Sequence, residues 1–64
     1  MAVLRVFDRQ GQTGTITLDN GTLTGSSKGA QGIADAALRK ANGNPSDAMR
    51  WLNGWSNGYV WAEP

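Results

Sequence analysis

The side chains best suited to bind a partner are the aromatic ones near the end of the chain. Four of the five aromatic residues lie in the last fourteen positions: Trp51, Trp55, Tyr59 and Trp61. Tryptophan and tyrosine bury a large area at little conformational cost, and they are enriched among the residues that dominate binding energies. Because the rest of the chain has few large apolar side chains, these rings either complete a small core or form a contact surface.

Helical and strand spacing suggest which of these rings face outward. A helix over 45–53 would turn Met49 and Leu52 inward, which leaves Trp51 at the flank of the apolar stripe. In a strand over 59–62, Tyr59 and Trp61 share one face, and the sequence leaves open whether this face or the opposite one is buried. We predict a partner-binding surface led by Trp51, Tyr59 and Trp61, with Arg50 and Asn57 in support.

Three classes of partner could use exposed rings of this kind. A protein would take the rings as anchors, single-stranded nucleic acid would stack its bases on them, and a saccharide would stack its ring faces on tryptophan. The nucleic-acid class is disfavoured because the net charge is only +1 and the basic residues are scattered rather than clustered. These residues are Arg5, Arg9, Lys28, Arg39, Lys40 and Arg50.

A short stretch near the end of the chain bears on the saccharide class. The run Leu52-Asn53-Gly54, followed by Ser56-Asn57, resembles part of the LysM wall-binding modules. The glycine-aspartate-threonine start of those modules is missing, so the sequence predicts membership of no family.

Enzymatic chemistry is poorly supported by the residue types present. Histidine and cysteine are both absent, which removes the commonest general base, the thiolate nucleophile and the usual zinc ligands. The carboxylates are dispersed along the chain, whereas a hydrolase needs two of them in one cleft. We therefore expect no enzymatic activity, no cofactor and no metal.

One segment has the composition of a weak anion site. Ser26, Ser27 and Lys28 lie between a strand and the start of a helix, where backbone N–H groups can bind an anion. The spacing of a phosphate-binding P-loop is absent, so an ordinary helix cap is the simpler interpretation.

The length of 64 residues allows one domain with a small core. Such a core supplies about 3–5 kcal/mol of net stability, and self-association is a common way to add to it. A homodimer is therefore one of the two states we consider, beside the monomer. No apolar run approaches the length of a membrane span, and we expect a soluble, cytoplasmic protein that does not bind membranes.

The first part of the chain predicts a three-stranded antiparallel meander over 2–25. A three-residue loop Arg9-Gln10-Gly11 would pair Phe7 with Thr13 and Leu4 with Ile16. A two-residue turn at Gln10-Gly11 is the alternative, but it would turn Arg5 toward the core. The next turn is clearer, since Asn20-Gly21 is typical of a type I′ hairpin that pairs Leu18 with Leu23.

The rest of the chain predicts two helices and a last strand. Apolar residues recur at helical spacing over 27–42, with Asn42-Gly43 as a stop signal. A second helix over 45–53 starts at the cap Asn44 and at Pro45, and 59–62 has β character. The fold class is therefore α+β, in the order β-β-β-α-α-β and in two layers. We expect a small interaction module, a regulator or inhibitor of the kind found among phage and plasmid accessory proteins, that binds another protein.

Overall fold

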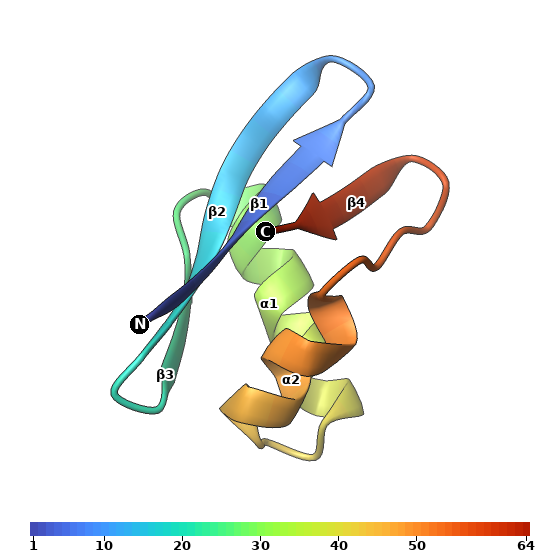
Figure 1. The fold of residues 1–64 in the computed structure, drawn as a ribbon. Helices are drawn as coiled ribbons and strands as arrows, with labels where there is room; N and C mark the ends of the chain where they lie inside the picture. Colours follow the sequence, from blue (N-terminus) through green and yellow to red (C-terminus); the bar gives the residue numbers. More distant parts are fainter.

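The computed structural model describes all 64 residues and contains one four-stranded antiparallel sheet and two helices (Figure 1). The strands are β1 (Ala2–Asp8), β2 (Gly11–Asp19), β3 (Thr22–Gly25) and β4 (Val60–Glu63), and the helices are α1 (Lys28–Lys40) and α2 (Pro45–Leu52). The strand order is β3-β2-β1-β4, so the last strand joins the meander beside β1. The predicted α+β class and element order are confirmed.

The register of the first hairpin is as predicted along most of its length. Leu4 lies opposite Ile16, and Val6 lies opposite Gly14. Leu4, Val6 and Ile16 are all buried, because they share the sheet face that the helices cover. Arg5 accordingly lies on the opposite face and is exposed.

The register changes near the turn, and the predicted pairing of Phe7 with Thr13 is wrong. Phe7 lies opposite Gln12, because Thr13 is an extra residue that forms a β-bulge. The Thr13 hydroxyl donates to the Val6 carbonyl (3.3 Å), which ties the bulged residue to the neighbouring strand. Strand β2 therefore begins at Gly11, and the turn contains two residues rather than three.

The second turn confirms the prediction from Asn20-Gly21. Both residues have positive φ, 52° and 77°, as a type I′ turn requires. Leu18 lies opposite Leu23, and both pack against the core.

Helix α1 is bounded by local hydrogen bonds at both ends. The Ser27 hydroxyl accepts from the Ala30 N–H (3.1 Å), so Ser27 is the cap and the helix starts one residue later than predicted. At the other end, the Gly43 N–H donates to the Leu38 carbonyl (2.8 Å) and Asn42 has a φ of 54°. This closing motif ends the helix at Lys40, two residues before the predicted end.

Two glycines let the start of α1 lie directly against the sheet. A Cβ on Gly25 would come within 2.2 Å of the Gln31 backbone nitrogen, and one on Gly14 would come within 2.7 Å of the Ser27 Oγ. Gly25 also donates its N–H to the Gln31 side chain (2.8 Å). The absence of a side chain at these positions therefore sets how closely the helix approaches β2 and β3.

Helix α2 begins as predicted, with the Asn44 side chain accepting from the Asp47 N–H (3.0 Å) and Pro45 in the first turn. It ends at Leu52, one residue before the predicted end, because Asn53 has left the helical conformation. Ala48, Met49 and Leu52 form its buried side, as their spacing predicts. Neither helix is both long and apolar enough to cross a membrane.

Strand β4 begins and ends one residue later than predicted, and its outer edge is covered by the segment that precedes it. The Gly54 N–H donates to the Ala62 carbonyl (3.2 Å), and the Ala62 N–H donates to the Trp55 carbonyl (2.9 Å). Ser56 also forms an isolated antiparallel β-bridge with Trp61. Residues 54–57 thus satisfy backbone groups that an edge strand would otherwise leave unpaired.

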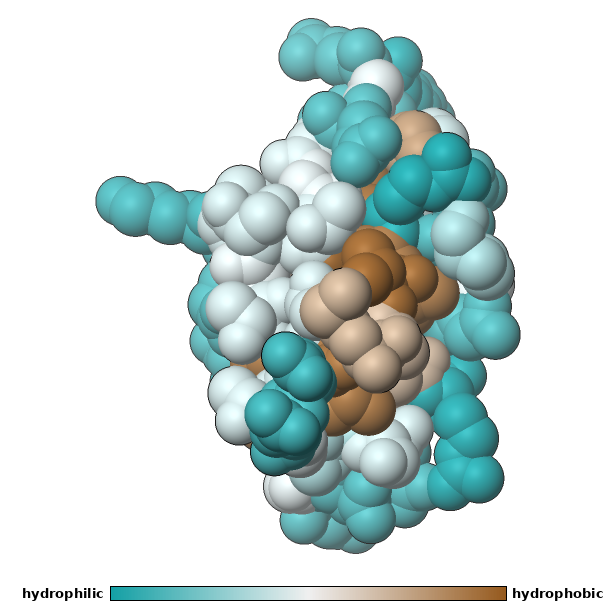
Figure 2. Space-filling view, turned by 60° about the vertical axis from the view of Figure 1, so that its left-hand side comes forward, coloured by the Kyte–Doolittle hydropathy of each residue, from teal (hydrophilic) through white to brown (hydrophobic).

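The core lies between the sheet and the two helices and is built largely from alanine on the helix side. Its residues are Leu4, Val6, Ile16, Ala30, Ala34, Ala37, Ala48, Met49 and Leu52, with Ala62 buried on β4. No polar or charged residue is buried. Figure 2 shows that, on the side nearest the N-terminus and β3, apolar side chains form a limited patch, bordered by residues of intermediate hydropathy on one side and by hydrophilic residues on the other.

Candidate functional site

The helices cover one face of the sheet and leave the other face open. Side chains alternate between the two faces along each strand, so the burial of Leu4, Val6 and Ala62 places their neighbours on the open side. We call this side the outer sheet face and define it by Val3, Arg5, Phe7 and Trp61, with Glu63 at its margin and Tyr59 in the bend that precedes β4.

A stacked aromatic pair lies on the outer sheet face near the edge of the sheet, where β1 pairs with β4. Phe7 and Trp61 are directly opposite each other on β1 and β4, with ring centroids 5.7 Å apart and planes inclined by 13°. Both side chains are half-buried, although no helix covers them. The pair therefore forms a rigid apolar platform that solvent and a partner can still reach.

Arg5 lies beside this platform and is held by three groups. Its guanidinium lies 5.5 Å from the centre of the Phe7 ring and 3.7 Å from a Glu63 carboxylate oxygen. It also donates to the Pro64 carbonyl from two nitrogen atoms (3.1 and 2.6 Å). These contacts are exposed and add little stability, but they fix the orientation of the arginine at the edge of the rings.

Tyr59 lies at the end of the face that adjoins the turn between β1 and β2. It is 67% exposed, and Arg9 lies 5.2 Å from the centre of its ring. The Asn57 side-chain oxygen accepts from the N–H groups of Tyr59 (2.9 Å) and Val60 (2.8 Å). Asn57 therefore shapes the turn that presents Tyr59, and the contact role predicted for Asn57 stays a prediction.

Trp51 and Arg50 lie elsewhere, because α2 packs on the covered side of the sheet. Trp51 is 42% exposed, as its place at the flank of the apolar stripe predicts, and its ring lies 5.7 Å from that of Trp55 at an angle of 32°. Arg50 forms an ion pair with Asp47 within the same helix. The predicted surface is thus divided: Tyr59 and Trp61 belong to the outer sheet face, and Trp51 with Arg50 belongs to the helix layer.

Sequence reasoning did not include Phe7, Arg5 or Arg9 in the site. The alternation along the first strand does place Phe7 and Arg5 on the face opposite Leu4 and Val6. The missing information was that β4 pairs with β1, which brings Trp61 onto Phe7.

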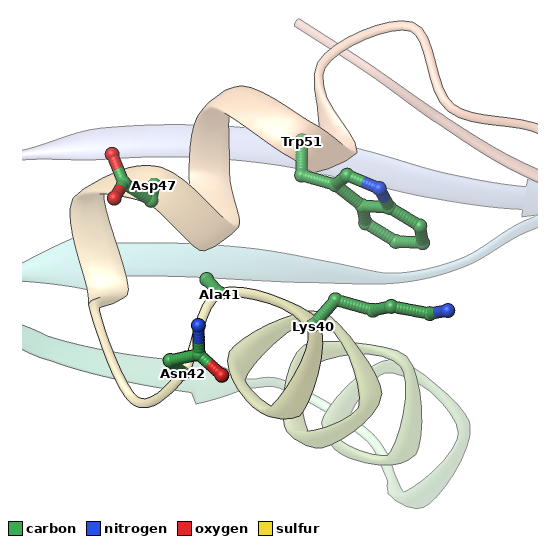
Figure 3. Close-up of a pocket in the computed structure, with 5 residues that line it drawn as sticks. All are labelled: Lys40, Ala41, Asn42, Asp47 and Trp51. Carbon is green, nitrogen blue, oxygen red and sulfur yellow. The ribbon is translucent and has the colours of Figure 1, made fainter.

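One pocket of about 280 Å³ lies where the end of α1 meets α2. Its lining consists of Lys40, Ala41, Asn42, Asp47 and Trp51 (Figure 3). In Figure 3 the Trp51 ring and the Lys40 side chain extend in the same direction from the two helices, whereas the Asp47 carboxylate points away from both.

The residues of the predicted anion site serve the fold. The Ser27 hydroxyl caps α1. The Ser26 hydroxyl accepts from the Thr15 N–H of β2 (2.8 Å), so the chain stays hydrogen-bonded to β2 just after β3 ends. Lys28 is exposed at the start of the helix. Both hydroxyl oxygens are thus occupied by backbone donors, as the cap interpretation expects.

The acidic residues do not gather into a group that could hold a metal ion. Compared with models of protein families, with curated proteins and with solved structures, this chain matches none of them.

Proposed function

We propose that this chain is a small, non-enzymatic interaction module that binds another protein through its outer sheet face. The observation that carries the proposal is the stacked pair of Phe7 and Trp61 on a sheet face that no helix covers, with the exposed Tyr59 at its end. We further propose that the module acts as an accessory regulator or inhibitor, because binding alone can block a surface of its partner.

The arrangement of the outer sheet face resembles the usual anatomy of a protein contact. Binding energy concentrates in a few tryptophan, tyrosine and arginine residues near the centre, and a polar rim excludes water around them. Here Trp61 and Phe7 form the centre, while Arg5, Arg9 and Glu63 form a charged margin. Because the rings are already stacked in the free protein, little side-chain entropy is lost when a partner covers them.

A binding experiment with matched variants tests this surface. The protein is immobilised, the protein that it captures from a lysate of its host is purified, and its affinity for each variant is measured. We expect Trp61→Thr and Tyr59→Ser to weaken binding at least about 30-fold each, which corresponds to the loss of about 2 kcal/mol at a hot spot. Threonine keeps the strand propensity at position 61, so the variant should remain folded.

Trp51→Ala is the control, since it removes an exposed tryptophan from the helix layer. We expect this variant to bind the captured protein as the wild type does. If Trp51→Ala abolished binding while Trp61→Thr and Tyr59→Ser had no effect, the contact would lie on the helix layer and the proposal would be wrong. Sedimentation of the wild type at tens of micromolar shows whether a second copy of the chain already occupies the face.

Single-stranded nucleic acid is the second candidate, and the position of the arginines favours it. Arg5 lies beside the Phe7 ring and Arg9 beside the Tyr59 ring. Bases could therefore stack on the rings while the neighbouring guanidinium groups bind the phosphates. Glu63 and the low net charge weaken this candidate. Binding to a labelled oligonucleotide that falls steeply with salt would support it, whereas binding to a protein that changes little with salt would support the first proposal.

A further inference from the structure

Four asparagine residues of the chain are each followed by glycine, and this dipeptide is chemically labile. The four pairs are Asn20-Gly21, Asn42-Gly43, Asn53-Gly54 and Asn57-Gly58. The backbone nitrogen of the glycine can attack the side-chain carbonyl carbon of the asparagine, because glycine has no Cβ that hinders the approach. The sequence therefore offers this reaction at four places, and the fold decides which of them reacts.

The reaction needs no reagent other than water. The glycine nitrogen loses its proton and forms a bond to the asparagine Cγ, the bond from Cγ to the side-chain nitrogen breaks, and ammonia leaves. Water then opens the resulting succinimide ring at either carbonyl, which gives aspartate or isoaspartate in place of asparagine. Because the glycine N–H must give up its proton, an N–H that donates a hydrogen bond in the fold reacts only after that bond opens.

Three of the four glycine N–H groups donate such a hydrogen bond. Gly43 donates to a carbonyl of α1 (2.8 Å), and Gly54 donates to a carbonyl of β4 (3.2 Å). Gly58 donates to the Ser56 hydroxyl (3.0 Å). These bonds close the end of α1, cover the edge of β4 and fix the turn before β4, so the fold protects the three asparagines that precede these glycines.

The N–H of Gly21 is different, because it donates to no group of the protein. Asn20 and Gly21 form the exposed tip of the type I′ turn between β2 and β3. Ring closure requires Asn20 to leave its φ of 52°, and a loop tip of this kind opens at low free energy. We propose that Asn20 is a site of spontaneous deamidation in the folded protein, with water as the co-reactant.

The isoaspartate product would loosen the hairpin that this turn joins. In isoaspartate the backbone runs through the former side chain, which adds one methylene group to the main chain. The two-residue turn sets Leu18 opposite Leu23, and the longer backbone does not fit the turn. Aspartate keeps the normal backbone and is common in such turns, so only the isoaspartate product lowers the stability of the fold.

Peptide mapping of aged protein tests the proposal. The folded protein is kept in mildly alkaline buffer, and its tryptic peptides are followed by mass spectrometry for a gain of one mass unit. Trypsin leaves Asn20 in the peptide 10–28, apart from the other three sites, which fragmentation distinguishes. We expect Asn20 to deamidate at least about fivefold faster than each of the others, a ratio that corresponds to the free energy of one hydrogen bond.

Two further measurements separate the cause from the sequence. Amide hydrogen exchange, recorded by NMR and corrected for intrinsic rates, should be at least about fivefold faster at Gly21 than at Gly43, Gly54 and Gly58. In guanidinium chloride the fold is lost, so all four asparagines should deamidate at similar rates.

The effect on the hairpin is measured on the isoaspartate form, separated from the aged protein by chromatography. It should unfold at a lower urea concentration than Asn20→Asp, which has the same charge and should unfold as the wild type does. An isoaspartate form as stable as Asn20→Asp would contradict the effect on the turn.

Three results would overturn the proposed site itself. They are equal rates at the four asparagines of the folded protein, a faster reaction at one of the other three, and an Asn20 that stays intact while the unfolded chain deamidates.

Discussion

Helix α1 lies directly against the sheet at Gly25, and adding one methyl group there should destabilise the protein strongly. A Cβ at this position would lie 2.2 Å from the Gln31 nitrogen, 2.5 Å from the Gln31 Cα and 2.6 Å from the Ala30 carbonyl carbon. All three atoms belong to the backbone of α1, so no side-chain rotation relieves the clash. The start of α1 must move away from β3 by about 1 Å to accommodate Gly25→Ala.

The cost follows from the two interactions that this movement disturbs. Overpacking of a fitted interface costs about 1–3 kcal/mol, and stretching the hydrogen bond from Gly25 to the Gln31 side chain costs about 1 kcal/mol. The total of about 2–4 kcal/mol is most of the stability expected for a domain of this size. Because 1 kcal/mol shifts the Tm of such a domain by about 4–8 °C, we expect a decrease of about 10–30 °C.

Thermal and urea unfolding followed by circular dichroism measure this effect, with Gly32→Ala as the control. Gly32 lies in the exposed part of α1, and a Cβ there meets no atom within 4 Å. Alanine should therefore stabilise the helix by about 0.5–1 kcal/mol. A Gly25→Ala protein as stable as the wild type would refute the close approach of α1 to β3 on which the packing depends.

Three further substitutions test the local structure, each by the same unfolding measurement. Ser27→Ala removes the side-chain cap of α1 and should lower the free energy of unfolding by about 1 kcal/mol. The control Lys28→Ala should change it by less than about 0.5 kcal/mol. Equal effects of the two substitutions would show that the cap is unimportant. Asn57→Ala removes the acceptor for two N–H groups of the turn before β4 and should lower the free energy of unfolding by about 1–2 kcal/mol. An unchanged free energy of unfolding would mean that Asn57 does not shape the turn. Leu52 is fully buried, and Leu52→Ala should lower the free energy of unfolding by about 2–5 kcal/mol and leave most of the chain unfolded. A folded variant would contradict this and would show that the core collapses around the cavity.

Local signals in the sequence predicted most of the fold. The Asn20-Gly21 turn and the Ser27 and Asn44 caps depend on interactions within a few residues, so the amino-acid types alone indicate them, and they indicate the ends of the helices to within two residues. The bulge at Thr13 is different, because its stability depends on the Val6 carbonyl of the neighbouring strand and on the turn that Asp8 stabilises. A three-residue loop with an unbroken register fits the same sequence pattern.

The candidate site was predicted less completely, because its halves are brought together by tertiary packing. Ala62 is buried on β4, and the alternation of side chains along the strand therefore places the Trp61 indole on the opposite face of the sheet. There Trp61 stacks on Phe7, a residue far away in the sequence. The packing of α2 on the covered side keeps Trp51 on the helix layer, so the single aromatic surface predicted from the sequence is two surfaces in the fold.

The most direct test of the outer sheet face as the contact surface is NMR mapping of the purified complex. The captured protein is added to ¹⁵N-labelled chain, and the change at each amide and indole N–H is recorded. Binding through the proposed surface predicts the largest changes at the Trp61 indole and at the amides of Val3–Phe7 and Tyr59–Glu63, with α2 unaffected. Changes centred on the Trp51 indole and the amides of α2, with Trp61 unchanged, would contradict it.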